Sequence, residues 1–268
     1  MVRQIHLLKA CNANNRSKSK LTAYERITME VYYIYYKNLD MKTYEDFKNA
    51  INSNIPNATF YPCDSDAPEN FSNKYLEFGP IIKILNSQRE KPTDILIIND
   101  TVFKSHSRIF VVQMIKDIKI LQKKPKDIKR NAYGEITKIT GSNIFLSSYF
   151  IWLPAFTGLK NHITFSINND KKIKEISTIL NKTDRKEIFD WVRWRCSMRG
   201  WYGADRSKLK TRRNYFRKLC AITMERELSS ALSKERKLTG FSQKRFLKLV
   251  DRLKINKAKI KKRFGYQK

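Results

Sequence analysis

The spacing of apolar residues along this chain changes between two patterns in a regular order. Aromatic and β-branched side chains gather in residues 30–37 and 58–61, which favours β-strands. Residues 42–54 carry apolar side chains at helical spacing, and residues 75–87 repeat that pattern, with Gly79-Pro80 as a candidate break. A continuous apolar run then occupies residues 95–98. The first hundred residues therefore predict the order β-α-β-α-β.

The run at residues 95–98 is typical of a strand that is buried on both faces and paired in parallel. Two crossovers of this length favour a three-layer α/β fold with right-handed connections. Further along the chain, apolar patterns predict a helix at 108–121, a strand at 132–140 and a core segment at 143–153.

The last part of the chain differs in composition. From residue 205 onward there are 22 Lys and Arg against five acidic residues, yet apolar residues still recur every three to four positions. This pattern predicts two amphipathic helices with Gly240 near their junction, rather than a disordered arm. We therefore divide the chain into an α/β domain at 1–180 and a basic amphipathic helical tail at 181–268.

The formal net charge of +30, from 55 Lys and Arg against 25 Asp and Glu, requires an anionic partner. Nucleic acid, anionic lipid and phosphorylated ligands all satisfy it. The segment 190–202 mixes three tryptophans with arginines, and packing, nucleic-acid stacking and membrane anchoring remain open for it. The four cysteines lack metal-ligand spacing, so we expect reduced thiols. We expect neither a signal peptide nor a membrane-spanning segment.

Polar residues follow two of the predicted parallel strands. Asp64, Ser65 and Asp66 come after the second strand, and Asn99 and Asp100 come after the third. The carboxyl ends of parallel strands meet at one edge of the sheet, where open α/β sheets bind ligands. Acidic residues gathered there suit a divalent metal, Mg²⁺ or Mn²⁺, that holds a diphosphate. The simpler alternative is a turn stabilised by Asx side chains.

Other motifs of catalysis are missing from the sequence. Walker A, G-x-G-x-x-G and G-x-S-x-G patterns are absent, as are signatures of nucleic-acid-binding folds. Ser147 and Ser148 lie inside the most apolar segment, so we expect buried hydroxyls that bond to the backbone.

Four segments together resemble the rhamnan synthesis protein F-like glycosyltransferases of bacteria: CDSD at 63–66, DILIINDTVF at 94–103, GEITKI at 134–139 and FLSSYFIWL at 145–153. In that family a strand ending in Asn-Asp-Ser/Thr precedes a short Gly–Thr segment and a Ser-Tyr-Phe run. The CDSD segment is also similar to the acidic nucleotide-binding strand end of GT-A-type transferases. The resemblance covers roughly residues 28–165. It implies a GT-A-like, Rossmann-like three-layer domain with a mostly parallel sheet.

The resemblance also implies roles for individual residues. Asp64, Ser65 and Asp66 would contact the nucleotide, and Asn99-Asp100 would stand in for the Asp-x-Asp metal site. Asp100 is then the one carboxylate at the metal position. Glu135 is the candidate base that deprotonates the acceptor hydroxyl, with an exposed strand glutamate as the alternative.

These observations favour a cytoplasmic glycosyltransferase of cell-surface polysaccharide assembly, such as lipopolysaccharide, capsule or O-antigen. It would transfer a sugar from a nucleotide-sugar donor to a lipid-linked or saccharide acceptor. Residues 205–268 would hold it against the anionic inner face of the cytoplasmic membrane. Two alternatives are a nucleic-acid-binding basic protein, which is not favoured, and an inactive sugar-binding relative of the transferases.

Overall fold

The computed structural model describes residues 28–100, 102, 108–123, 128–138, 144–166 and 212–241. The N-terminal half of this part alternates strands and helices, as the sequence predicts. The elements are β1 (Met29–Tyr35), α2 (Met41–Asn52), β2 (Ala58–Asp64), η1 (Pro68–Asn73), α3 (Phe78–Asn86), β3 (Thr93–Asn99), α5 (Arg108–Gln122), β4 (Asn131–Lys138), β5 (Ile144–Phe156), α10 (Arg212–Ser233) and β6 (Lys237–Gly240).

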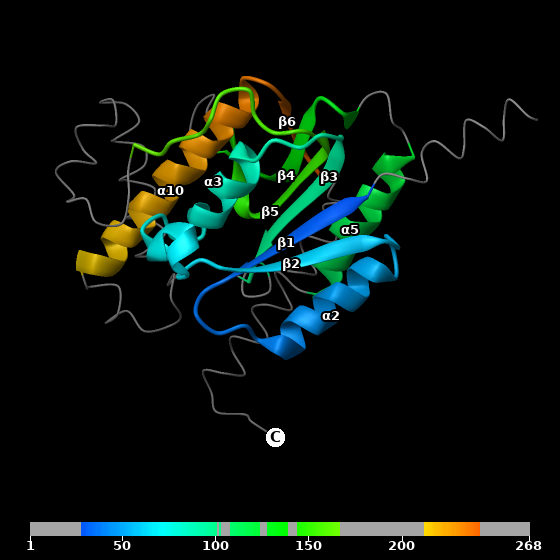
Figure 1. Ribbon diagram of the computed structural model, residues 1–268, viewed down its shortest axis with the longest axis horizontal. Helices are drawn as coiled ribbons and strands as arrows, with labels where there is room; N and C mark the ends of the chain where they lie inside the picture. The colour runs from blue at the N-terminus through cyan, green and yellow to red at the C-terminus, as the bar shows by residue number, and fades with distance from the viewer. Residues whose placement is uncertain are drawn as a thin grey trace, which may run out of the picture.

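The strands form one mixed, mostly parallel sheet in the order β2-β1-β3-β5-β4-β6 (Figure 1). β1 pairs in parallel with both β2 and β3. β5 runs antiparallel to β3 and β4, and β4 pairs in parallel with β6. The parallel crossovers and the helices on both faces are compatible with a Rossmann-like α/β fold.

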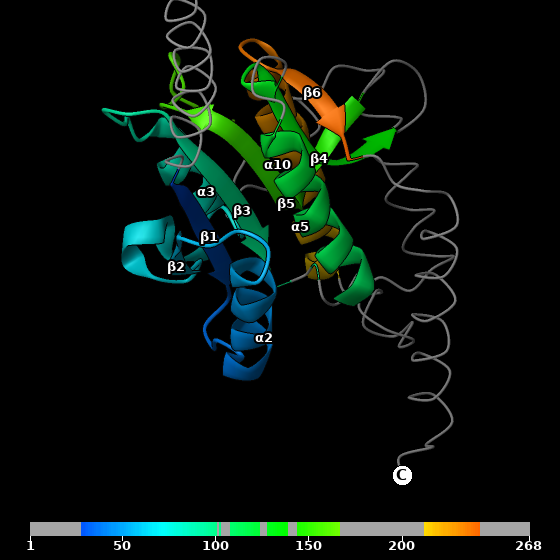
Figure 2. The same ribbon diagram turned by 90° about the vertical axis from the view of Figure 1, so that its right-hand side faces the viewer.

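Helices cover both faces of the sheet, so the fold has three layers (Figure 2). Residues of α3 and α10 form one core cluster with the side of the sheet that we call the α3/α10 face. Residues of α2 and α5 form a second cluster on the opposite side, the α2/α5 face. Successive side chains of a strand point to opposite faces, so β1 and β3 contribute to both clusters.

Strand β3 lies at the centre of the sheet, and all seven of its residues are buried. Its one charged side chain, Asp94, accepts hydrogen bonds from Ala155 N (2.9 Å) and Gln122 Nε2 (2.9 Å). Burial raises the pKa of the Asp94 carboxyl, although these hydrogen bonds and the nearby Arg236 act in the other direction. The apolar run therefore forms the strand, and a hydrogen-bonded carboxyl fixes its start.

Helix α3 begins at Phe78, so the helix predicted from residue 75 starts three residues later, and Gly79-Pro80 lies in its first turn instead of dividing it. Pro80 lies in the first turn of the helix, where an absent N–H costs nothing. Gly79 is needed because a Cβ at this position would clash with the carbonyl oxygen of Asn70. The pair that looks like a helix breaker thus allows the helix to begin close against the preceding loop.

The basic C-terminal region contributes to the same sheet, which differs from the predicted separate helical tail. Apolar residues of α10, including Leu219, Ile222 and Leu228, lie in the core of the α3/α10 face. β6 adds a strand beside β4, where the sequence predicts a junction between helices. The segments 167–211 and 242–268, with the Trp/Arg stretch, lie outside the described residues. No helix in the described ranges has the length and hydrophobicity needed to cross a bilayer.

Candidate functional site

The carboxyl ends of β1, β2 and β3 define the edge where a ligand is expected. From β1 the chain crosses to β2 on one side and later reaches β3 on the other. The point between such diverging connections is where open α/β sheets bind ligands. Lys37, Asp64 to Asp66, and Asn99 with Asp100 all come directly at or after these strand ends. The polar residues that the sequence places after these strands therefore lie at one edge of the sheet.

Asp64 and Asp100 flank the end of β1. Tyr35 of β1 pairs with Asp64, and Ile34 pairs with Asn99, so Asp100 is level with Tyr35. The Asp100 N–H continues the pairing by donating to the Ile34 oxygen (3.0 Å). Two strand spacings separate Asp64 from Asp100, or about 10 Å between backbones. The two carboxylates thus lie on either side of the point where the connections diverge.

The Asp64 side chain organises the local turn. Its Oδ1 accepts hydrogen bonds from the backbone N–H groups of Lys37 (3.0 Å) and Asp66 (2.9 Å). The Asp64 carbonyl accepts from Asn70 Nδ2 (2.7 Å), and the buried Ser65 donates its N–H to the Tyr35 oxygen (2.8 Å). Asp64 therefore joins the ends of β1 and β2, as the alternative of an Asx turn predicts. The same hydrogen bonds hold the Asp64 carboxylate at the edge of the sheet.

Lys37 lies among these acidic residues. Its Nζ is 3.6 Å from Asp66 Oδ2, and the Lys37 side chain is 57% exposed. A contact with the Tyr36 hydroxyl raises the Lys37 pKa, and the charge of Asp66 adds to that shift. Solvent screens such an exposed pair. Lys37 is thus an exposed cation at the strand end, held only weakly by Asp66.

Asn99 and Asp100 follow β3. Asn99 is 2% exposed, and alternation along β3 places it on the α3/α10 face, opposite to Asp100. Burial, followed by the charges of Asp100 and Asp40, raises the pKa of the Tyr33 hydroxyl. Asp100 is therefore near the tyrosine and near the start of α2. The described residues contain no group of three His, Cys, Asp or Glu side chains suited to a metal ion.

Glu135 lies in β4, away from the strand ends. Gly134 and Ile97 both pair with Ile151 of β5, so they are level across the sheet. Glu135 is therefore separated from β3 by a whole strand and lies before the level of Asp100. The structure brings Asp64, Ser65, Asp66, Asn99 and Asp100 to one edge, and it does not bring Glu135 there.

A second carboxylate cluster at this edge has no signal in the sequence. Ser148 is buried in β5, and its Oγ lies 2.9 Å from Glu225 Oε1 and 3.4 Å from Glu77 Oε1. One hydroxyl hydrogen serves only one acceptor, so the shorter contact to Glu225 is the hydrogen bond. Because Ile98 pairs with Phe150, Ser148 is level with Asp100. The expectation of a hydroxyl bonded to backbone is wrong for Ser148.

An irregular pairing explains this contact. Between the pairs Gly134–Ile151 and Ile136–Leu146, β4 advances two residues and β5 advances five. At this irregularity two backbone N–H groups of β5 bond to α10: Leu146 N donates to Ser229 Oγ (2.9 Å) and Ser148 N donates to Glu225 Oε1 (2.9 Å). A bulge of this kind bends the strand and aims its side chains.

Comparison with known proteins gives no relative. No protein-family model, no curated protein and no solved structure matches this chain. The residues at the sheet edge are therefore the basis for assigning a function.

Proposed function

We propose that this protein is a GT-A-like glycosyltransferase that takes a sugar from a nucleotide-sugar donor and transfers it to a lipid-linked or saccharide acceptor. The observation that carries the proposal is the position of Asp64 and Asp100 on either side of the end of β1. A charged donor bound there would contact polar groups from three strand ends. Lys37 would supply a positive charge for the phosphates of the donor.

The proposal gives each residue at the edge a task. Asp64, Ser65, Asp66 and Asn99 would bind the nucleotide part of the donor. Mg²⁺ in proteins is often bound through one or two carboxylates together with substrate phosphates, so a single carboxylate at Asp100 fits Mg²⁺ or Mn²⁺. Such a metal neutralises the charge of the diphosphate. The metal would then take its oxygen ligands from Asp100 and from the phosphates of the donor.

Two carboxylates are candidates for the base that deprotonates the acceptor hydroxyl. Glu135 is the carboxylate that the resemblance implies, and Glu225 is the one nearest to the level of Asp100 through its bond to Ser148. Comparing E135Q with E225Q separates the two. Loss of transfer with unchanged donor binding identifies the base.

Nucleoside diphosphates test donor binding directly. A ligand that binds only the folded state raises the melting temperature, and the shift grows with the logarithm of ligand concentration over Kd. We expect one diphosphate among those of uridine, guanosine, adenosine, cytidine and thymidine to stabilise the protein, and Mn²⁺ or Mg²⁺ to increase the shift. D100N should remove the metal-dependent part. E90Q changes an exposed carboxylate just before the start of β3, at the opposite end of that strand from Asp100, and should retain it. No shift with any diphosphate rejects the proposal.

Nucleic-acid binding is the second candidate, because the chain has a net charge of +30. The charge is distributed unevenly: residues 28–100 hold seven Lys and Arg against eleven Asp and Glu. The sheet edge is thus a poor place for a phosphate backbone. Binding to a single-stranded oligonucleotide that weakens steeply with salt, together with no response to nucleoside diphosphates, would favour this function.

We further propose that the enzyme acts at the cytoplasmic face of the membrane in polysaccharide assembly. Residues 205–268 would contact the lipid, and because α10 contributes apolar residues to the core, we assign the contact within this region to residues 242–268. This segment has eleven Lys and Arg against one acidic residue. Each cation near an anionic surface contributes about 1 kcal/mol.

A further inference from the structure

Two exposed aromatic rings lie on the α3/α10 side of β2, and each one rests against a second ring. Tyr61 is 40% exposed and stacks on Tyr32, with ring centroids 5.0 Å apart and an interplanar angle of 20°. Phe71 is 41% exposed and meets Tyr75 edge-on, at 5.2 Å. Tyr32 and Tyr75 both pack against the core of this face. We call these four residues, which form the two separate ring pairs Tyr61–Tyr32 and Phe71–Tyr75, the aromatic shelf.

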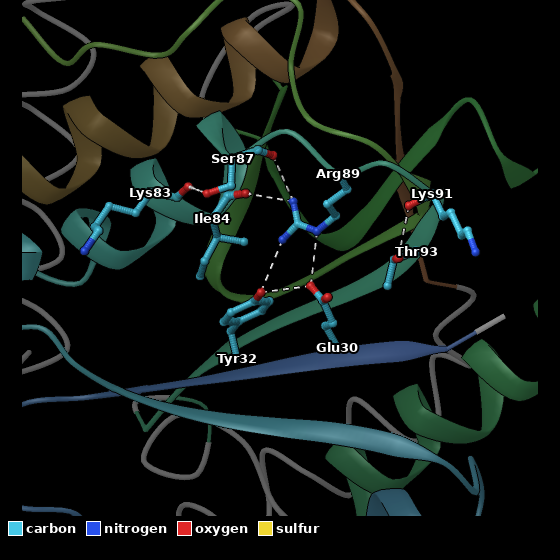
Figure 3. Close-up of polar contacts among 8 residues, drawn as sticks. All are labelled: Glu30, Tyr32, Lys83, Ile84, Ser87, Arg89, Lys91 and Thr93. Carbon is cyan, nitrogen blue, oxygen red and sulfur yellow. Dashed lines mark hydrogen bonds and ion pairs between the residues drawn. The ribbon is translucent and has the colours of Figure 1, made fainter.

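The backing of Tyr61 is fixed in place. The Tyr32 hydroxyl donates to Glu30 Oε2 (2.8 Å) and accepts from Arg89 Nη2 (3.2 Å), as Figure 3 shows. Arg89 in turn donates to the Ile84 and Ser87 carbonyls at the end of α3. Burial and the bond to Glu30 raise the pKa of Tyr32 to about 12, so its hydroxyl stays neutral. The Tyr61 ring therefore rests on a preorganised partner.

The other side of the Tyr61 ring faces away from the sheet. Tyr61 and Tyr32 are directly opposite each other in the β1–β2 pairing. β2 is the last strand at its end of the sheet in the described part of the chain. A flat ligand can therefore stack on Tyr61 without displacing a strand.

The backbone holds Phe71 in an unusual conformation. Phe71 and Ser72 have φ values of 66° and 44°, in the left-handed region that residues other than glycine rarely adopt. The Ser72 N–H donates to the Ala67 oxygen (3.1 Å), and the Lys74 N–H donates to the Phe71 oxygen (2.8 Å). Strain of this kind is retained where surrounding contacts impose it and is common at binding sites. Here it accompanies the exposure of an apolar ring.

The charges around the shelf select the type of ligand. Residues 58–77 carry four carboxylates and a single cation, Lys74, to which α3 adds Lys83. Without a metal ion or another cation between them, these carboxylates repel a polyanionic phosphate backbone. They suit neutral hydroxyl groups, which donate hydrogen bonds to carboxylates. A pyranose ring combines such hydroxyls with an apolar C–H face that can cover an aromatic ring. We infer that the aromatic shelf binds a neutral saccharide; its use as the acceptor site rests on the proposed glycosyltransferase function.

Binding to an array of neutral oligosaccharides, without nucleotide, tests this inference. We expect the full-length protein to retain one class of oligosaccharide and Y61A and F71A to weaken binding by roughly tenfold each. Y61F keeps the ring and should stay within about twofold of the natural protein. I120A removes a side chain that is 55% exposed on α5, across the sheet, and should change nothing. Thermal unfolding of each variant shows whether it is folded.

The outcomes separate this inference from the proposed function. Saccharide binding that depends on Tyr61, without stabilisation by any nucleoside diphosphate, supports the shelf and rejects the transferase. No retained oligosaccharide, or equal binding by Y61A and I120A, overturns the inference. Binding of a single-stranded oligonucleotide that is lost in Y61A overturns it as well, because the shelf would then be a nucleic-acid site.

Discussion

Glu225 of α10 accepts two hydrogen bonds from Ser148 of β5, one from the backbone N–H and one from the hydroxyl, each 2.9 Å long. The two residues are 77 positions apart in the chain. They connect the basic C-terminal region to the central sheet at the level of Asp100.

E225A should therefore destabilise the protein. Removing the carboxylate leaves a buried Ser148 N–H without its acceptor, which costs about 1–3 kcal/mol in the free energy of unfolding. S148A keeps the backbone contact and should cost less. Urea unfolding of both variants, beside E90A as an exposed control, measures the difference. Equal midpoints for E225A and E90A would contradict this role of Glu225.

R89A should destabilise the fold through several contacts at once. The Arg89 guanidinium bonds to Glu30 Oε2 (3.1 Å), Tyr32 and the end of α3 (Figure 3). It also lies over the Phe156 ring. Breaking this largely buried pair removes the cation that balances Glu30 and leaves the Tyr32 hydroxyl as its hydrogen-bond donor, and we expect a loss of about 2–4 kcal/mol. R89K keeps the charge without the planar geometry and should recover only part of it.

An exposed pair serves as the control for Arg89. Lys48 and Glu45 lie 3.5 Å apart on α2, and both side chains are more than a third exposed. K48A should change the free energy of unfolding by less than about 0.5 kcal/mol. Thermal or urea unfolding of R89A, R89K and K48A under one condition tests the order. A cost for R89A as small as that for K48A would refute the argument.

Asp94 should make stability depend on pH in a direction opposite to most aspartates. Burial raises the pKa of this carboxyl in the folded state. The folded state then binds the proton more tightly, so this contribution is complete below the unfolded pKa and is lost as pH rises through the folded pKa. Relative to D94N, the natural protein should gain stability as pH falls from 7 to 4. Urea unfolding of both proteins across this range gives the difference, and a fall toward pH 4 would disprove the assignment.

Truncation tests where the domain ends. The chain 1–204 lacks α10 and β6, whose buried residues include Leu219, Leu228 and Leu232, and it should not fold. The chain 1–241 keeps both elements and should unfold cooperatively with a near-natural midpoint. Circular dichroism during heating distinguishes the two. A folded 1–204 would show that the C-terminal region is separable after all.

The shorter folded chain also tests membrane contact. We expect 1–241 to bind phosphatidylglycerol vesicles more weakly than the full-length protein, because it lacks eleven cations of 242–268. Neither protein should bind phosphatidylcholine vesicles. Equal partition of both onto the anionic vesicles would exclude 242–268 as the anchor.

The sequence predicts the parts of the fold in which local pattern and burial coincide. β3 is a continuous apolar run at the centre of the sheet, and it begins and ends where the pattern changes. The polar residues after β2 and β3 then follow from the parallel order. The start of α3 is less predictable from sequence, because it depends on the close packing of Gly79 against Asn70. This is a contact between two segments, and no local pattern specifies it.

Long-range features could not be predicted in the same way. β6 has only four residues and pairs with β4 alone in the described part of the chain. Lys237–Gly240 is therefore too short and too exposed to show the alternation of apolar residues that identifies a strand. The carboxylates around Ser148 are 71 and 77 positions away. Their meeting depends on the irregular pairing of β5, which no local pattern specifies. Glu135 illustrates the opposite error, since its position in a motif does not bring it to the strand ends.

The pairing of β4 with β6 has a consequence for how the protein is made. Asn131 of β4 pairs with Lys237 of β6, and a ribosome that adds about 5–20 residues per second needs roughly 5–20 s to synthesise the chain between them. During that interval the nascent polypeptide has an open edge at β4, and the apolar surface that α10 later covers is bare. We therefore expect newly made chains to depend on chaperones that bind apolar segments until translation has passed residue 241.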